Sequence, residues 1–332
     1  MSRLGGTGED QRFLALTHLA EDAVARIIFL SPFATTEITG GIKTAYRQAE
    51  LLVGLGFDAC VYQPDGAPSW FTTQARVLTG PHLATRPGDI LVFPEVLNGM
   101  LAEMVHFPVK KVLFCQAHYY TLFNPIPPQR YRELGFAKVG CQSAIAKGFL
   151  ERVLHLADVA IIPCYIDAEL FVPRAKTMQI ALIPRKLPRE AAAIQRIFSL
   201  KYPQFQSIPW DIVESKTERE TADIFGRSAI VLSLPFLESF GLVPLEAMAS
   251  GAIVAGFHGY GGQEYARPDN GFWFAPDHLE EVADALARIV IGLERKDPGL
   301  LKMRDAGLAT AAHYSKERTR AALRAFYGDL VK

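Results

Sequence analysis

Several well-known catalytic signatures are missing from this chain of 332 residues. It contains no G-x-G-x-x-G, no G-x-x-x-x-G-K-[ST], no H-E-x-x-H and no G-x-S-x-G. These patterns are typical of dinucleotide-dependent dehydrogenases, P-loop NTPases, zinc proteases and α/β-hydrolases, respectively. Their absence removes the main signals for those four classes. An Asp-x-Asp pair is also missing, and nothing else in the sequence indicates a metal site.

The sequence has equally little that suggests export or a membrane span. Its four cysteines form no C-x-x-C pair, and each lies in or beside an apolar run, which favours buried free thiols in a reducing compartment. No apolar stretch reaches the ~18 residues of a spanning helix. The N-terminus carries acidic residues and lacks a basic-then-apolar signal pattern. We therefore expect a cytoplasmic protein, with peripheral contact at the inner membrane face left open.

Net charge is absent too, because 35 lysines and arginines balance 35 aspartates and glutamates. Overall charge therefore does not favour a nucleic-acid partner, and we expect none. Hydrophobic residues make up 49% of the chain and charged residues 21%. A chain of this length and composition can bury the cores of two domains.

What the sequence does contain is a regular alternation of short apolar runs and amphipathic segments. The runs are β-branched or aromatic and apolar on both faces, which is typical of parallel strands covered on both sides. They occupy residues 26–31, 58–63, 89–94, 110–115, 137–141, 159–163, 178–184, 228–234, 251–257 and 272–274. Between them, segments such as 41–54 and 279–294 place their apolar residues on one helical stripe. Repeated βα units of this kind predict a doubly wound α/β fold.

The pattern runs twice, so we expect two sheet domains that face a central cleft. We predict an N-terminal extension over 1–24, an N-terminal domain over 25–166 and a C-terminal domain over 167–310. The polar stretch 167–176 marks the linker, and 311–332 is expected to end in a helix whose packing against the N-terminal domain is left open. Ligands of such folds bind at the carboxyl ends of the strands, which here line the cleft.

The densest run is LPFLESFGLVPLEAMASGAIVAG, residues 234–256. A buried strand leads into a loop and then a helix, from about residue 241 to 250, with Pro244 in its first turn and Gly251 at its C-terminal cap. Glu238 is therefore placed in the loop and Glu246 on the helix. A helix N-terminus favours phosphate and carboxylates accept hydrogen bonds from sugar hydroxyls, so one interpretation is a site for a phosphorylated sugar or nucleotide. The other is that Glu238 caps the helix and Glu246 is solvated.

The same run carries a family resemblance. ESFGLVPLEAMASG resembles the E-x7-E signature of retaining GT-B glycosyltransferases of the family-4 type, and the similarity continues through AIVAGFHGYGGQEYARPDNGFWFAPDHLEEVADAL. Upstream, IPCYIDAELFVP resembles the interdomain segment of that family, and TGGIKTAYRQAELLVGLGFDACVY its first glycine loop and helix. The similarity spans most of residues 26–330. It implies the GT-B fold of two facing Rossmann-like domains, a nucleotide diphosphate sugar as donor substrate, and neither metal nor other cofactor.

The resemblance also implies roles for the matching residues of the C-terminal half. Glu246 would hold the ribose hydroxyls of the nucleotide, and Glu238 would contact the donor sugar. The backbone of Phe240, Gly241 and Leu242 would receive phosphate.

In the N-terminal half, Gly40 and Gly41 would let the backbone approach the donor and the acceptor, although a Gly-Gly turn without function is the alternative. The family usually has a histidine after an N-terminal strand, near the donor sugar. Here the strand is followed by QAHYYTLF, so either Gln116 or His118 takes that place.

The basic pair that neutralises the diphosphate in this family departs from its pattern here. Arg185 matches the arginine, but Glu190 stands where the lysine is expected. Lys186 or Arg189 is the candidate replacement, because the charge on the leaving group must be stabilised. The alternative is that these cations belong to a solvated turn.

These features predict transfer of a sugar from a nucleotide diphosphate sugar to a glycan or glycolipid hydroxyl, with retention at the anomeric carbon, in bacterial polysaccharide or glycolipid synthesis. Glu238, Arg185 and His118 are the candidate catalytic residues. The alternative is a catalytically inactive nucleotide-sugar-binding partner of another glycosyltransferase, which the altered basic motif favours. The segment 207–221 is expected to border the base pocket, where Trp210 either stacks on the base or joins the core.

Overall fold

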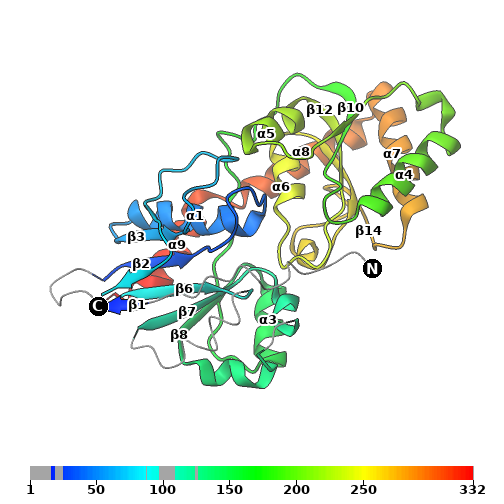
Figure 1. Cartoon of the computed structure of the whole chain (residues 1–332). Coiled ribbons are helices and arrows are strands. Elements are labelled where there is room, and N and C mark those ends of the chain that lie inside the picture. Colours follow the sequence, from blue (N-terminus) through cyan, green and yellow to red (C-terminus); the bar gives the residue numbers. More distant parts are fainter. Residues whose placement is uncertain (1–15, 19–24, 87, 97–108, 124–125, 332) are drawn as a thin grey trace.

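The computed structural model describes residues 16–18, 25–86, 88–96, 109–123 and 126–331. Two parallel sheets and the helices that cover them make up most of it (Figure 1). Of the predicted extension 1–24, only Leu16–His18 is described, as strand β1, which pairs with β5 (Leu83–Thr85) in a small sheet of its own. The rest of that extension lies outside the described residues.

The larger sheet is seven-stranded, in the order β4-β3-β2-β6-β7-β8-β9, and every neighbouring pair is parallel. Its strands are β2 (Ile27–Leu30), β3 (Ala59–Tyr62), β4 (Val77–Leu78), β6 (Ile90–Pro94), β7 (Lys110–Cys115), β8 (Phe136–Cys141) and β9 (Ala160–Ile161). The four residues of β2 and the four of β3 are all buried, as the two-sided apolar pattern predicts.

Helices cover both faces of this sheet. The helices α1 (Gly40–Val53) and α9 (Lys316–Tyr327) lie on one face, and α3 (Ala144–Val153) lies on the other (Figure 1). The separate cores agree with this arrangement, because Leu323 of α9 packs with Leu52 of α1, whereas Leu150 of α3 belongs to the opposite core. The C-terminal helix is therefore part of the first sheet's packing.

The second sheet has five parallel strands in the order β11-β10-β12-β13-β14. They are β10 (Thr177–Leu182), β11 (Trp210–Ile212), β12 (Ser228–Ser233), β13 (Ile253–Phe257) and β14 (Phe272–Phe274). The helices that cover it are α4 (Pro188–Lys201), α5 (Glu218–Arg227), α6 (Leu242–Ala249), α7 (Leu279–Glu294) and α8 (Pro298–Ala312). Residues of α4 and α7 share one core, and residues of α5, α6 and α8 share the other. Both sheets are thus doubly wound, as the sequence predicts.

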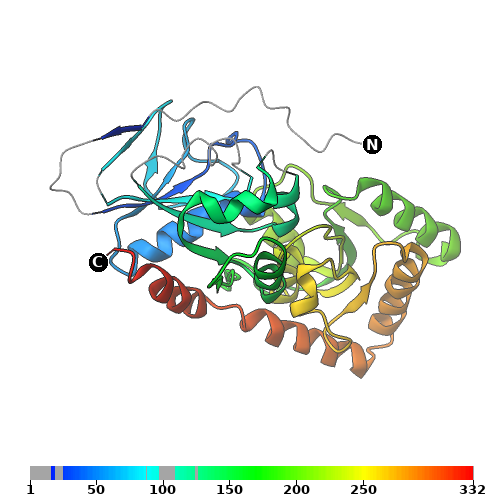
Figure 2. The same cartoon turned by 90° about the horizontal axis from the view of Figure 1, so that it is seen from below.

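The chain passes between the sheets at two neighbouring places. One crossing leads from β9 to β10, and the other from α8 to α9. The N–H of Ile166 donates to the carbonyl of Tyr314 at 2.9 Å, and the Thr319 hydroxyl donates to the carbonyl of Pro163 at 2.9 Å. Figure 2 shows α8 and α9, in orange-red and red, following one another along one side of the molecule. The two crossings are therefore hydrogen-bonded to each other.

None of the helices in the described part of the chain combines the length and the apolarity that a membrane-spanning helix requires.

Candidate active site

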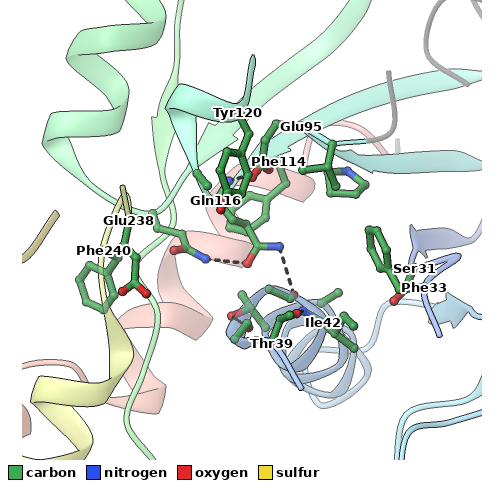
Figure 3. A pocket seen from close by; sticks show the side chains of 18 of the residues that line it. Ser31, Phe33, Thr39, Ile42, Glu95, Phe114, Gln116, Tyr120, Glu238 and Phe240 are labelled. Atoms are coloured by element: carbon green, nitrogen blue, oxygen red, sulfur yellow. Dashed lines mark hydrogen bonds between the residues drawn. The ribbon is translucent and has the colours of Figure 1, made fainter. Parts of the chain in front are cut away.

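A cavity of ≈260 Å³ lies between the two sheets. Its wall includes the residues that follow the strands at their carboxyl ends: Ser31 after β2, Glu95 after β6 and Gln116 after β7, and on the opposite side Arg185 after β10 and Glu238 after β12. Figure 3 shows Glu95 and Gln116 facing this cavity from one domain and Glu238 from the other. The parallel topology accounts for the gathering on each side, since all carboxyl ends of one parallel sheet lie at one edge. That the two sides face each other depends on how the domains are packed.

Two helix N-termini border the cavity. The helix α1 begins at Gly40, and its cap residue Thr39 accepts a hydrogen bond from the N–H of Ile42 at 3.4 Å. The helix α6 begins at Leu242, directly after Gly241. All five of these residues line the cavity. The first N–H groups of a helix and its dipole favour an anion, so two such ends facing one cavity make it suited to phosphate.

Gly241 has a conformation that only glycine adopts without strain here. Its φ is 86°, and a Cβ at this position would lie 3.0 Å from Glu238 Oε2 and 3.0 Å from the Tyr265 hydroxyl. The same hydroxyl donates a hydrogen bond to the Gly241 carbonyl at 2.7 Å. A side chain at residue 241 would therefore displace the carboxylate of Glu238 or the phenol that supports the loop.

Charged groups meet around Glu238. Lys186 Nζ lies 2.7 Å from Glu238 Oε1, and both side chains are partly exposed. Tyr120 approaches from the other domain. Burial and the carboxylates of Glu95 and Glu238 raise the pKa of Tyr120, while the Arg185 guanidinium acts in the opposite direction. Two carboxylates, two cations and a phenol therefore surround the middle of the cavity.

The two candidates for the missing lysine of the basic motif, Lys186 and Arg189, lie in different places in the structure. Arg185 and Lys186 both line the cavity, whereas Arg189 is not part of its wall. Arg189 and Glu190 belong instead to the first turn of α4, where the negative charge of Glu190 suits the helix N-terminus. Lys186 is thus the cation placed beside Glu238.

The structure also places Gln116, rather than His118, in the cavity wall. The amide of Gln116 donates to the Gly41 carbonyl at 3.1 Å and accepts from Gln142 Nε2 at 2.7 Å. His118 is buried, with Nδ1 2.7 Å from the Ser239 hydroxyl, which also accepts from the His118 backbone N–H at 2.8 Å. Burial lowers the pKa of His118 to about 4. His118 therefore links the N-terminal domain to the loop between Glu238 and α6, outside the cavity wall.

Glu246 occupies a different environment from Glu238. Lys43 Nζ, on α1, lies 2.7 Å from Glu246 Oε1 and 3.0 Å from Glu218 Oε1. Arg47, one turn further along α1, lies 2.8 Å from Glu218 Oε2. Burial acts to lower the pKa of Lys43, but the Glu246 and Glu218 carboxylates outweigh it and raise the pKa above its ordinary value. These four residues, the interdomain ion cluster, join α1 to α5 and α6.

Other contacts also cross between the domains. The N–H of Glu218, at the start of α5, donates to the carbonyl of Trp70 at 2.8 Å. The Glu264 carboxylate accepts from the N–H of Ala144 at the start of α3. The rings of Tyr119 and Tyr260 pack edge to face, 5.1 Å apart. The two domains thus touch each other at several points around the cavity.

Comparison with known proteins gives these features a context. Residues 211–297, which include both glutamates of the E-x7-E run and the N-terminus of α6, match the family described as glycosyl transferases group 1. Residues 211–297 are therefore similar to group 1 glycosyltransferases.

Over a longer part of its length, the chain is similar to a curated protein and to many solved structures. An alpha-1,6-glucosyltransferase from Actinobacillus pleuropneumoniae is 27% identical over 238 residues, which is 69% of this chain and 72% of the relative. A sucrose-phosphate synthase from Thermosynechococcus elongatus superposes with a TM-score of 0.68 at 15% identity, over 92% of this chain and 99% of that one. The pneumococcal O-GlcNAc transferase GtfA, solved with UDP and GlcNAc, reaches a TM-score of 0.55 at 15% identity, over 74% of this chain and 57% of its own. The fold is GT-B, as the resemblance implied.

Two further expectations concern Trp210 and a metal ion. Trp210, on the edge strand β11, is half-buried and packs edge to face on Phe198 of α4, with 5.8 Å between ring centroids. It therefore contacts the core, and a stacking role toward a base stays a prediction. In the part of the chain that the structure describes, no three histidine, cysteine or acidic side chains come together as metal ligands would. The expectation that no metal takes part also stays a prediction.

Glu95 and Lys43 are two residues of the candidate site that the sequence analysis does not single out. Glu95 directly follows the apolar run 89–94, so its place at the carboxyl end of a predicted strand was a usable signal. Lys43 had no such signal, because its partner Glu246 lies 203 residues further along the chain and on the other domain.

Proposed function

We propose that this protein is a retaining, metal-independent glycosyltransferase that transfers a sugar from a nucleotide diphosphate sugar to an acceptor hydroxyl, in bacterial polysaccharide or glycolipid synthesis. The observation that carries the proposal is the convergence of two helix N-termini, Arg185 and Lys186 on one cavity beside Glu238. The similarity of residues 211–297 to group 1 glycosyltransferases supports it, and the name of the curated relative makes a glucosyl donor the first to test.

In this proposal the diphosphate lies between the N-termini of α1 and α6, next to Arg185 and Lys186. The helix ends and the two cations would stabilise the charge that develops on the leaving diphosphate, which is the part that a metal ion plays in other enzymes. Glu238 would accept hydrogen bonds from the donor sugar. Lys186 would then exchange its contact with Glu238 for one with phosphate.

Glu246 would accept hydrogen bonds from the ribose hydroxyls. In the structure its carboxylate faces Lys43, and the space beside the interdomain ion cluster is only ≈30 Å³, room for about two water molecules. Donor binding would therefore require Lys43 and α1 to move away from Glu246. Closure of the domains over the donor would then exclude water from the reaction.

The reaction breaks the bond between the anomeric carbon and the diphosphate oxygen and forms a bond from that carbon to the acceptor oxygen on the same face. The acceptor proton passes to the departing diphosphate oxygen, so no separate base is needed. Glu238 and Gln116 border this centre, and their part is to orient the sugar.

Two measurements test the proposal. A thermal-shift screen against UDP, GDP, ADP and dTDP should identify one base, because a ligand that binds only the folded state raises the melting temperature. NMR of the product formed from the matching donor should show the anomeric configuration of the donor. An inverted product would contradict the retaining mechanism. Nucleotide-sugar binding without turnover, over a broad acceptor panel, would instead favour the inactive binding partner.

A further inference from the structure

The N-terminal domain supplies most of the cavity wall, and the described part of that wall carries no lysine, arginine or histidine. Its charged residues are both acidic: Glu37, which is exposed, and Glu95, which is buried. Its uncharged polar residues are Ser31, Thr39, Thr44, Gln116, Tyr120 and Gln142. In the proposed function the N-terminus of α1 faces the donor diphosphate. Apart from that helix end, this side of the cavity offers hydroxyls, amides and carboxylates to an acceptor.

The two cations among the described residues of the cavity wall both come from the opposite domain. Arg185 and Lys186 follow β10, and Lys186 Nζ lies 2.7 Å from Glu238 Oε1. In the proposed function these two cations neutralise the donor diphosphate and are not available to a second anion.

Glu95 is held firmly in this wall. It is 3% exposed and directly follows β6, and its Oε2 accepts a hydrogen bond from the backbone N–H of Gln116 at 2.9 Å. The side-chain amide of Gln116 is in turn fixed between Gly41 and Gln142. Figure 3 shows Glu95 next to Phe114, Gln116 and Tyr120, on the side of the cavity away from Thr39. These hydrogen bonds thus hold the Glu95 carboxylate in a defined position, from which it can contact a ligand.

A buried carboxylate discriminates between ligands by charge. Burial raises the pKa of Glu95, and hydrogen bonds from backbone N–H groups oppose that rise by favouring the charged form. A phosphate or carboxylate brought next to it would face a like charge in a site of low dielectric, where repulsion is poorly screened. A sugar hydroxyl would instead donate a charge-assisted hydrogen bond.

The remaining wall suits a sugar ring. Phe29, Phe33, Val92 and Phe114 present apolar surface to the cavity, and aromatic surface can pack against the C–H face of a sugar. The volume of ≈260 Å³ lies below the roughly 300–1,000 Å³ of sites for drug-sized ligands. In the proposed function the donor diphosphate occupies part of this volume, so the space that remains for the acceptor fits a sugar-sized group at most.

We infer that the acceptor group entering this cavity is an uncharged sugar unit bound through a hydroxyl to Glu95, and that sugars carrying phosphate or carboxylate on that unit are rejected. The inference rests on the proposed function and adds the class of acceptor to it. Glu95 acts here as a specificity-determining residue, because its charge attracts hydroxyl donors and repels anions.

The test compares neutral hexosides with monophosphates of the same hexosides. The phosphate is placed at one ring position at a time, so that only one compound in each series blocks the accepting hydroxyl. Transfer to each acceptor and release of nucleotide without acceptor are measured in parallel with the donor selected above. We expect kcat/KM to favour the neutral acceptors by roughly 100-fold or more, the scale that like-charge contacts impose.

Glu95→Gln keeps the shape of the side chain and removes its charge. We expect it to raise the acceptor KM by about tenfold, with a smaller change in the donor KM. The ratio of kcat/KM for neutral acceptors to kcat/KM for phosphorylated acceptors should fall by a similar factor. The comparison variant is Glu37→Gln, which removes an exposed and therefore well-screened charge from the same cavity. It should change the ratio far less.

Three outcomes would overturn the inference while leaving the proposed function intact: preference for a phosphorylated acceptor, a ratio that Glu95→Gln does not change, or nucleotide release that no neutral sugar stimulates. Failure of the proposed function looks different, because the protein would then consume no nucleotide diphosphate sugar with any acceptor, neutral or phosphorylated.

Discussion

The two glutamates of the E-x7-E run, Glu238 and Glu246, are eight residues apart and yet occupy opposite kinds of environment. Glu238 borders an open cavity of ≈260 Å³, and its side chain is 22% exposed beside Lys186. Glu246 is 8% exposed, beside a space of ≈30 Å³, and its partner Lys43 belongs to the other domain. One carboxylate is accessible to a ligand in this arrangement, and the other holds the domains together.

The difference shows how one local motif can serve two purposes. The pair of Glu238 with Lys186 is partly exposed, and such pairs contribute little to stability, so it can exchange partners when a ligand arrives. The interdomain ion cluster is buried, and removing one member of a buried pair is costly because it leaves an uncompensated charge. We therefore expect changes at Glu238 to affect the reaction, and changes around Glu246 to affect both stability and nucleotide binding.

The largest effect is expected from Glu238→Gln. The amide keeps the size of the side chain but loses the charge that the proposed function places against the donor sugar, so kcat/KM should fall by about 100-fold or more. The melting temperature should change little, because the lost ion pair is partly exposed. Steady-state kinetics and thermal unfolding measure the two effects. A loss of less than tenfold in kcat/KM would show that the charge of Glu238 is not important for the reaction, although its side chain borders the cavity.

The next effect is expected from Glu246→Gln, which leaves Lys43 paired with Glu218 alone. We expect the free energy of unfolding to fall by about 1–3 kcal/mol, below the full cost of breaking a buried pair because Glu218 remains as partner. Donor KM should rise about tenfold through the lost ribose contact, with a smaller change in kcat. Urea unfolding and donor titration measure both. Unchanged stability would argue that the cluster does not hold the domains together.

A smaller effect of opposite sign is expected from Lys43→Met. Nucleotide no longer has to displace the ammonium group from Glu246, so the Kd of the nucleoside diphosphate should fall by about three- to tenfold. The matched control is Arg47→Met, which removes a cation of the same cluster that pairs with Glu218. It should leave nucleotide affinity close to that of the wild type. Weaker binding by Lys43→Met would mean that Lys43 contacts the nucleotide directly.

The smallest effect concerns His118, which connects the N-terminal domain to the loop carrying Glu238. Its pKa in the folded protein, about 4, lies below the ordinary 6.5. Between these values the unfolded chain binds a proton that the folded chain excludes, so stability falls as the pH decreases through 6.5 toward 4. We expect a loss of about 1 kcal/mol between pH 7 and 5.5 from this group.

Urea unfolding at the two pH values measures this loss, and His118→Gln supplies the control. The variant cannot take up the proton, so the difference between pH 7 and 5.5 should shrink by the same amount. An identical pH dependence in both proteins would show that His118 is protonated equally in the folded and unfolded states.

Much of the fold follows from local patterns. The predicted helix near residues 241–250 is found as α6, Leu242–Ala249, and Gly251 has the positive φ, 71°, that its capping place requires. The strands that the sequence does not reveal, β1, β4, β5 and β11, are only two or three residues long. They are too short to form an apolar run, and pairing with a neighbouring strand defines them.

The candidate site was only partly predictable, for a different reason. The sequence narrows the histidine position to Gln116 or His118, but the direction of each side chain depends on the 3-10 helix η2 (His118–Leu122) that begins after the strand. The choice of Lys186 over Arg189 depends likewise on where α4 begins. In both cases a turn of one or two residues decides which side chain faces the cavity. The spacing of residues along the chain does not define the conformation of such a turn.

The sequence by itself determined the two doubly wound sheets, the helix N-terminus beside Glu238 and the resemblance to glycosyltransferases, because period, capping residues and motif spacing are local properties. Only the tertiary structure decided three other features: Gln116 faces the cavity, Lys43 covers Glu246, and Glu95 lies in the N-terminal part of the cavity wall, whose described residues include no cation. These last facts depend on how two domains meet, and electrostatic contacts between groups some 200 residues apart arise only when the domains are packed together.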